Sequence, residues 1–477
     1  MGKGEPIDSG TDRTENTPGD QRQSGPEDKF YLVSRRVFHN NKPDVVLECM
    51  GSQWELQCPH FTKSGTLANL HMAARQQRVK LQQERKGSNR SAGNRALFQP
   101  SISGFSRDKQ KGGKLSGSLP LQLPVKHHTV TKDALSVAPR RLCNPEACLD
   151  RWEETLVSAA SLLGPPHLFK RCLTEMIDKI SCSTVCDFHQ VSCRYKEKSL
   201  QRACERWLEL HLVTELRYFI CLRDLPFEVL HKTLRSPRVF ASCEYDLLKT
   251  VLYWVFLQFN PDAQIMPSHR TIISFFSRTG VFLEQPKGHK FIVLFQAVRL
   301  HGITERRHLE ELQMIRVFPQ AWLLHMFSRQ YYTLHSGGDM QVTDFSHQAV
   351  RFGMVVEKEP QYCTKVIELY GFYFLIKAAC SVDTDTHGFS LQRLRHSEPA
   401  MSVQACEGHP FSMMSVRLVT YQINVQAKVR GQWQEFCSGP INKEFGLNKD
   451  TCKSQVFTVK RLNMPIFVTF ALAFQAP

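Results

Sequence analysis

The residues best suited to metal chemistry lie in the segment CSTVCDFHQVSC. Its thiol and imidazole groups, which are side chains that bind zinc, are spaced four, three and four residues apart at Cys182, Cys186, His189 and Cys193. On a helix this spacing places them along one face, whereas zinc sites usually draw ligands from two separate elements. We therefore interpret them as core or partly buried helical residues, and we predict neither a metal ion nor another cofactor.

Motifs of the common enzyme classes are missing from the sequence. It has no Gly-rich phosphate loop, no Gly-x-Ser-x-Gly nucleophile turn and no His-Glu-x-x-His pair. The sequence thus predicts a protein that is not an enzyme. Protein-interaction surfaces become the candidates for its function.

The elements that hold the cysteine-rich segment are predicted to be helices. Apolar residues recur every three or four positions from Arg171 to Phe259, and start signals such as Asp224-Leu225-Pro226 separate the stripes. We expect an array of short antiparallel helices over residues 166–260. A helix-rich extension over residues 261–335 should follow it.

This order of elements, with Trp207 near the end of one helix and YDLLKTVLYWVF forming another, resembles the BACK domain of BTB-BACK proteins. The segments VFLEQPKGHKFIVLFQAVRLHGI, at residues 281–303, and PQAWL, at residues 319–323, are similar to the region after BACK in the germ cell-less-like branch. The resemblance implies that a BTB/POZ domain precedes the helices.

The first part of the chain resembles such a domain, which we place at residues 29–165. A short helix is predicted over Lys29–Phe38, two strands flank Met50-Gly51-Ser52, and a helix begins near Ser64. The later stretch LPLQLPV, from Leu119, is typical of an edge strand, because proline cannot donate to a sheet ladder. Together these elements resemble the first half of a BTB/POZ domain, followed, after an intervening segment, by a strand of its second half.

Two segments have the composition of disordered chain. Residues 1–28 are acidic and rich in Gly, Ser and Pro, and residues 75–118 carry eleven Lys and Arg against two acidic residues. We expect residues 75–118 to be a disordered basic insertion within the BTB/POZ domain. Because its basic residues do not alternate regularly with aromatic ones, we do not expect the insertion to bind nucleic acid.

The pattern changes after Ser336-Gly337-Gly338 to an alternation that is typical of strands. Stretches such as KVIELYGFYFLIKAACSV and MPIFVTFALAF are rich in Val, Ile, Phe and Tyr. We predict an antiparallel β-sandwich over residues 342–477. The fold class is therefore α+β, with an interrupted BTB/POZ domain, a BACK-like helical array and a C-terminal β domain.

Candidate contact residues follow from these elements. The Lys29–Phe38 helix should form a dimer interface through its apolar residues Phe30, Val33, Val37 and Phe38. Side chains expected to contact a client protein, near loops of the β domain, are Arg393, Arg395, Arg430 and Trp433, although Trp433 could equally be a plain strand residue. Ser397, in RLRHSEP, resembles a basophilic kinase site, and a plain loop serine is the alternative.

The family resemblance implies a homodimeric adaptor that brings an unidentified client protein to a cullin-3 ubiquitin ligase. The alternative is a structural scaffold, at the nuclear envelope or in germ cells, that binds no cullin. The family's hydrophobic-x-Glu cullin signature is not found in the segment from Arg75, which occupies its place. Sixteen scattered Cys, no long apolar run and no signal-peptide core predict a cytoplasmic or nuclear protein without membrane contact.

Overall fold

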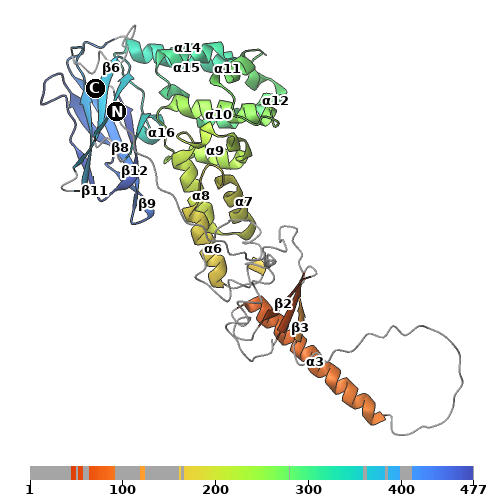
Figure 1. The fold of residues 1–477 in the computed structure, drawn as a ribbon. Coiled ribbons are helices and arrows are strands. Elements are labelled where there is room, and N and C mark those ends of the chain that lie inside the picture. The colour runs from red at the N-terminus through yellow and green to blue at the C-terminus, as the bar shows by residue number, and fades with distance from the viewer. Residues whose placement is uncertain are drawn as a thin grey trace, which may run out of the picture. The chain divides into compact units, whose positions relative to one another are not determined.

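The computed structural model describes the chain in ten stretches: residues 45–49, 52–56, 64–91, 119–123, 161–162, 166–278, 280–357, 362–381, 385–397 and 411–475. The chain divides into two compact units, Met1–Leu173 and Thr174–Pro477. Each unit is considered by itself below, and Figure 1 shows the elements of both.

The first unit holds a small sheet whose strands come from both sides of the predicted insertion. Strand β1 (Val45–Cys49) pairs antiparallel with β2 (Ser52–Leu56) and parallel with β3 (Leu119–Gln122), in the order β2-β1-β3. Burial alternates along β1, with every second side chain buried. The predicted pair of strands around residues 50–52 and the predicted edge strand from Leu119 are therefore confirmed.

Helix α3 (Gly65–Ser91) begins where the sequence predicted and ends much later. The Ser64 hydroxyl accepts a hydrogen bond from the Leu67 N–H at 3.1 Å, which caps the helix start. The prediction that disorder begins at Arg75 is wrong, because residues 75–91 are helical. Residues 66–86 contain no Gly or Pro and are rich in Gln, Arg, Lys, Leu and Ala, which favour helix although most are polar.

The predicted helical array comes next in the chain. Its first helix, α6 (Pro166–Asp178), includes the boundary between the two units. The helices that follow, in the second unit, are α7 (Val185–Tyr195), α8 (Lys198–His211), α9 (Phe227–Arg235) and α10 (Glu244–Phe259), with the short 3-10 turns η1 (Leu216–Tyr218) and η2 (Ile220–Asp224) between α8 and α9. The apolar stripes face inward, so that Leu200, Cys204 and Leu208 are buried. The indole N–H of Trp254 donates to the Leu225 carbonyl at 3.0 Å and ties α10 to the turn before α9.

The predicted extension is a further set of helices packed through aromatic rings. They are α11 (His269–Ser277), η3 (Phe282–Glu284), α12 (Pro286–His289), α13 (Ile292–Ala297), η4 (Leu300–Gly302), α14 (Arg306–Met314) and α15 (Gln320–His335). Phe276, Phe282 and Phe291 are buried together. A Cβ at Gly288 would lie 2.0 Å from the Phe282 carbonyl oxygen, so this packing requires glycine.

The C-terminal part is an antiparallel β-sandwich, as predicted. One sheet contains β4 (Val350–Val356), β8 (Arg417–Val429), β9 (Gln432–Cys437), β10 (Ile441–Phe445) and β12 (Asn463–Ala473). The other contains β5 (Tyr362–Leu369), β6 (Phe372–Ser381), β7 (Thr386–Arg393) and β11 (Phe457–Lys460). Buried side chains of both sheets form one core, which includes Phe374, Phe389 and Phe470.

One predicted strand is in fact a hairpin. KVIELYGFYFLIKAACSV is divided between β5 and β6, because Tyr370 and Gly371 both take positive φ angles of 50° and 82°. A two-residue loop with positive φ at both positions matches the twist of the paired strands. The helix α16 (Phe345–Gln348) connects α15 to the sandwich.

A buried ion pair joins the helices to the sandwich within the second unit. The guanidinium Nε of Arg351, on β4, donates to a carboxylate oxygen of Glu244, at the start of α10, over 2.6 Å. Their side chains are 6% and 0% exposed. Lys365 on β5 adds a hydrogen bond from its Nζ to the Ser242 carbonyl at 3.1 Å, so two strands are attached to the same short segment before α10.

Apolar and backbone contacts extend this junction. The Gly353 N–H donates to the Ser242 carbonyl at 3.1 Å, and a Cβ at Gly353 would lie 2.3 Å from the Ala241 carbonyl oxygen. The rings of Phe240 and Phe467 meet edge to face at 5.1 Å. Besides its own core, the sandwich therefore shares a small cluster with the helices, formed by Leu210, Phe240 and Phe467.

Replacing Glu244 with Ala is expected to lower the free energy of unfolding by about 3–5 kcal/mol, because Arg351 would keep an unpaired buried charge. Chemical denaturation of the full chain measures the change. Arg306→Ala is the matched control, since it breaks the exposed Arg306–Glu310 pair on α14 and should change the free energy by less than about 1 kcal/mol. Equal effects of the two substitutions would contradict the assignment.

Candidate interaction surfaces

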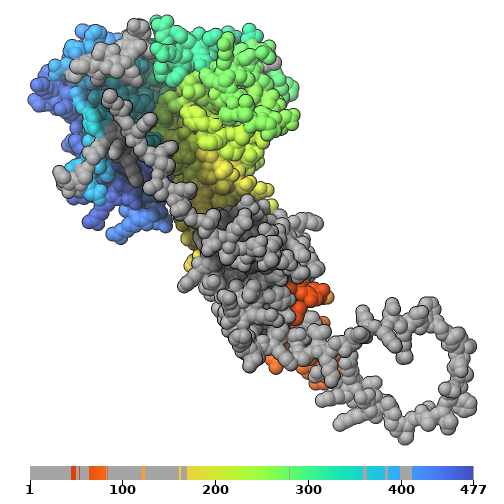
Figure 2. Space-filling view, in the orientation of Figure 1, coloured from red at the N-terminus to blue at the C-terminus, as the bar shows by residue number. Residues whose placement is uncertain are grey.

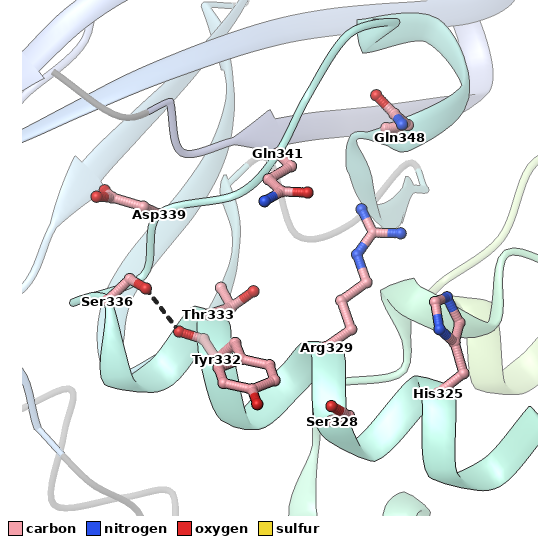
Figure 3. Close-up of a pocket in the computed structure, with 9 residues that line it drawn as sticks. All are labelled: His325, Ser328, Arg329, Tyr332, Thr333, Ser336, Asp339, Gln341 and Gln348. Carbon is pink, nitrogen blue, oxygen red and sulfur yellow. Dashed lines mark hydrogen bonds between the residues drawn. The ribbon is translucent and has the colours of Figure 1, made fainter.

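Helix α15 presents a polar cleft beside the segment that leads into the sandwich. His325, Arg329, Tyr332 and Ser336 follow one another at helical spacing along its cleft-facing side. Asp339, Gln341 and Gln348 line the other side, and Figure 3 shows the Arg329 side chain extending between helix and segment toward Gln341 and Gln348. The cavity measures about 380 Å³, which is enough for a side chain of a partner.

The acidic and basic groups of this cleft differ in how they are paired. The Asp339 carboxylate accepts from the buried Arg417 guanidinium at 2.6 Å. Gln348 Oε1 accepts from the backbone N–H groups of Thr343, at 2.6 Å, and Asp344, at 2.9 Å, which leaves its Nε2 as a donor. In the described part of the chain, no acidic side chain forms an ion pair with Arg329. The cleft therefore carries an uncompensated positive charge.

The positive charge of Arg329 affects the pKa of the neighbouring His301. Burial, followed by the positive charge of Arg329, lowers the pKa of the His301 imidazole from its usual value to about 4. The His301 Nε2 donates to the Gln348 carbonyl at 3.1 Å, so the neutral ring is held at the edge of the cleft. His301 thus reports the electrostatics of the cleft.

Large apolar side chains lie exposed beside the cleft. Leu324, Tyr331 and Tyr332 on α15 are 68%, 64% and 65% exposed. The two tyrosine rings meet edge to face at 5.7 Å. Met414 lies close to the end of α15, since its sulfur would be 3.2 Å from a Cβ placed on Gly337. Its side chain is exposed as well. We name Leu324, Tyr331, Tyr332 and Met414 the α15 ridge; in Figure 2 the blue-green α14–α15 segment forms part of the outer surface.

A second cavity, of about 460 Å³, lies over α8 and α9 and has a different electrostatic character. Lys232 pairs with Glu205 at 2.6 Å, and Arg238 pairs with Glu209 at 3.0 Å. Arg206 also reaches Glu209 at 3.0 Å. Because these cations and carboxylates satisfy one another, we interpret the groove as a structural network.

The thiol and imidazole side chains of the cysteine-rich segment do not converge on a common point. The Cys182 thiol faces Glu215, and the Cys186 thiol faces the Cys221 carbonyl. Burial, with smaller contributions from nearby acidic groups, raises the pKa of both thiols to about 12, which disfavours the thiolate that zinc requires. Cys193 Sγ lies 3.8 Å from His189 Nδ1. Within the described stretches, no three His, Cys, Asp or Glu side chains converge as metal ligands.

Arg393 is not on the surface, contrary to the prediction that it contacts a client. Its side chain is 2% exposed, and its guanidinium donates to the carbonyls of Phe445, at 2.8 Å, Ser415, at 3.3 Å, and Met414. It also lies over the Phe372 ring. Arg393 is the last residue of β7, where the sandwich closes, so its charge serves the fold.

The remaining predicted contact residues are distributed over two loops and the junction. Arg395 is half-buried and donates to the Leu447 carbonyl, whereas Ser397 beside it is exposed. Arg430 is exposed at the turn between β8 and β9, with a φ of 51°. Trp433 is half-buried and packs against Phe467 and His211 at ring distances of 5.9 and 6.2 Å. These contacts favour the strand-residue interpretation of Trp433.

The predicted dimer residues Phe30, Val33, Val37 and Phe38 lie outside the described residues, as do residues 1–28. The α15 cleft was not predicted at all. Its residues share no sequence motif, and the sequence predicted only a helix-rich extension there. The sequence feature that could have indicated the cleft is the group of large apolar residues near Arg329 on the same helix.

Comparisons with known proteins address both ends of the chain. Residues 44–176 match a family model described as the BTBDG BTB/POZ domain, and residues 350–456 match the C-terminal domain of BTB/POZ domain-containing protein 16. Human Germ cell-less protein-like 1 is 22% identical over 276 residues, which cover 54% of this chain and 53% of that protein. Drosophila melanogaster Protein germ cell-less is 21% identical over 332 residues, covering 61% and 57%.

The chain therefore matches BTB/POZ family models over two regions and is similar to the germ cell-less proteins. The first matched region covers β1, β2, α3 and β3, so the BTB/POZ model includes the strands on both sides of the basic segment. The second covers β4 to β10 and ends just before β11. The chain spans about half the length of the curated relatives that it matches.

The α15 cleft lies between the two matched regions, since it involves residues 325–348. None of the helices in the described stretches is long and apolar enough to cross a bilayer. The family assignment thus rests on the sheet of the first unit and on the sandwich, while the cleft is a separate feature of the helical extension.

The pKa of His301 predicts an acid-sensitive cleft. The folded pKa, about 4, lies below the unfolded value near 6.5, so this imidazole contributes stability that is complete above about pH 6.5 and is lost as pH falls toward about 4. His301→Asn, which keeps an amide donor for the Gln348 carbonyl, should flatten the pH dependence of unfolding over this range. Urea denaturation at several pH values measures it, and unchanged pH dependence would contradict the assignment.

Proposed function

We propose that this BTB/POZ protein is a non-enzymatic interaction adaptor that serves as a substrate receptor for a cullin-3 ubiquitin ligase. The observation that carries the proposal is the buried Glu244–Arg351 junction, which makes the helices and the sandwich one recognition body attached to a BTB/POZ unit. The client side of the adaptor is this second unit. The cullin side and a homodimer interface are assigned to the BTB/POZ unit.

The mechanism of such an adaptor is proximity. A client held by the second unit is confined near the ligase that the BTB/POZ unit holds, which raises its effective concentration without new chemistry. Arg430, on an exposed turn, and Ser397, on an exposed loop, remain proposed contact and phosphorylation positions on the client side. Arg393 is withdrawn from this set, and Arg395 and Trp433 contribute only through their exposed parts.

The alternative is a structural scaffold, at the nuclear envelope or in germ cells, that binds other proteins but no cullin. One observation favours it: α3 continues as a helix through the position where the family resemblance places the cullin-contacting signature. That part of α3 exposes Met72, at 61%, and Val79, at 48%. These two side chains are seven positions apart and therefore lie on the same face of the helix. If the chain does bind a cullin, we propose that they make the contact.

Cullin-3 capture by the tagged full chain tests the proposal. We expect cullin-3 in the precipitate of the wild type, and a reduction of about tenfold or more for Met72→Asp with Val79→Asp, since a charge would replace apolar contacts. Gln77→Asp, an exposed position on another side of α3, is the matched control and should bind as the wild type does. Absence of cullin-3 from the wild-type precipitate would give the scaffold alternative the lead.

Removal of residues 342–477 is a poor test of client binding, because it would expose Phe240 and Glu244 at the junction. Point substitutions on the surface of the second unit are the better tools. They leave both units intact and separate the client side from the cullin side.

Homodimerisation is tested at the Lys29–Phe38 segment. Val33→Asp with Val37→Asp should convert a dimer to a monomer in light scattering, because two charges would be buried in an apolar interface. The Lys29→Asp variant, outside the apolar set, controls for added negative charge. A double variant that stays dimeric would assign the dimer to another surface.

A further inference from the structure

We propose that the α15 cleft binds the carboxylate of an Asp or Glu side chain in an extended segment of a partner protein. Arg329 receives the carboxylate, and the α15 ridge contacts an apolar residue next to it. The proposal rests on the adaptor function only because it identifies the partner protein as a client. Binding to the cleft does not itself involve a cullin.

An anion is the expected occupant because donors and positive charge converge in the cleft. Arg329 offers several N–H donors in a plane, a geometry that matches a carboxylate in a bidentate pair. Gln348 Nε2 and the Ser328 hydroxyl lie on the same lining. The one carboxylate of the lining, Asp339, is already neutralised by Arg417 at 2.6 Å. It lies on the far side of the cleft from His325 in Figure 3.

A carboxylate fits better than a phosphate. Sites for phosphorylated segments generally place a cluster of Arg around the doubly charged group. Here the lining places only the exposed imidazole of His325 beside Arg329, and the one carboxylate of the lining, Asp339, is paired with Arg417. The charge of the lining therefore suits a singly charged group.

The ridge indicates that the carboxylate belongs to a polypeptide and not to a small molecule. Tyr331 and Leu324 are exposed outside the cavity and next to it along the helix. Tyr and Arg are the residues that most often dominate binding energy at protein interfaces. A segment with an acidic residue in the cleft would place a neighbouring apolar residue over these side chains, whereas a small acid would leave the ridge uncovered.

Fluorescence anisotropy with the purified full chain provides the test. The probe is a fluorescein-labelled extended peptide in which Glu alternates with Leu and Tyr. Two matched peptides carry Gln or phosphoserine at the Glu positions. We expect the Glu peptide to bind at least about tenfold more tightly than the Gln peptide. Equal affinity of those two, tighter binding of the phosphoserine peptide, or no binding of any probe would overturn the proposal.

Substitutions assign the binding to the cleft. Arg329→Glu should abolish binding of the Glu peptide, Arg329→Lys should retain part of it, and Tyr331→Ala should weaken it. Arg307→Glu is the matched control, because Arg307 is exposed on α14 and has no ion-pair partner in the described residues. Loss of binding in Arg307→Glu, or its retention in Arg329→Glu, would contradict the assignment.

The pKa of His301 supplies a readout that does not depend on folding changes. A bound carboxylate would offset the charge of Arg329, so the Glu peptide should raise the pKa of His301 measured by NMR titration. Arg329→Gln should raise it without peptide. Cullin-3 capture by Arg329→Glu should remain at the wild-type level, so failure of this inference and failure of the adaptor proposal are distinguishable.

Discussion

The buried pair of Glu244 and Arg351 is the interaction on which the arrangement of Thr174–Pro477 depends. Glu244 is the first residue of α10, where the helix dipole favours a negative charge, and Arg351 is the second residue of β4. Two glycines make room for this contact. A Cβ at Gly302 would lie 2.7 Å from Glu244 Cγ, and one at Gly353 would meet the Ala241 carbonyl. Because desolvation offsets much of the attraction between buried charges, we infer that the pair fixes orientation more than it adds stability.

A fixed junction determines what surfaces the second unit can present. The α15 cleft is formed by a helix of the extension and by the segment that enters the sandwich, and both sides are anchored. The Met340 N–H donates to the Phe474 carbonyl at 2.8 Å, and His301 donates to the Gln348 carbonyl. If helices and sandwich moved independently, the cavity beside Arg329 would have no constant shape. The recognition surface is therefore a property of the joined body and not of either part.

The sequence predicted the elements whose burial follows a single period. The helical array, the β1–β2 pair and the sandwich all have one apolar face, so their patterns were sufficient. Three features were missed for different physical reasons. Helix α3 was hidden because polar residues such as Arg78 and Gln82 favour helix as well as disorder. Arg393 was placed on the surface because an Arg before a loop is usually exposed, and only the fold shows the carbonyls that satisfy it. The cleft depends on residues that come together only after the junction forms.

Arg329 differs from other charged side chains of the second unit because it has no carboxylate partner among the described residues. Elsewhere in the second unit, Arg217 pairs with Asp246 and Arg417 with Asp339, while backbone carbonyls satisfy Arg393. A half-buried guanidinium without a carboxylate loses part of its hydration and gains no compensating attraction. In this position it also lowers the pKa of His301. Tyr331 and Tyr332 lie exposed beside it, so an anionic partner bound at this place would both supply the missing attraction and cover these rings.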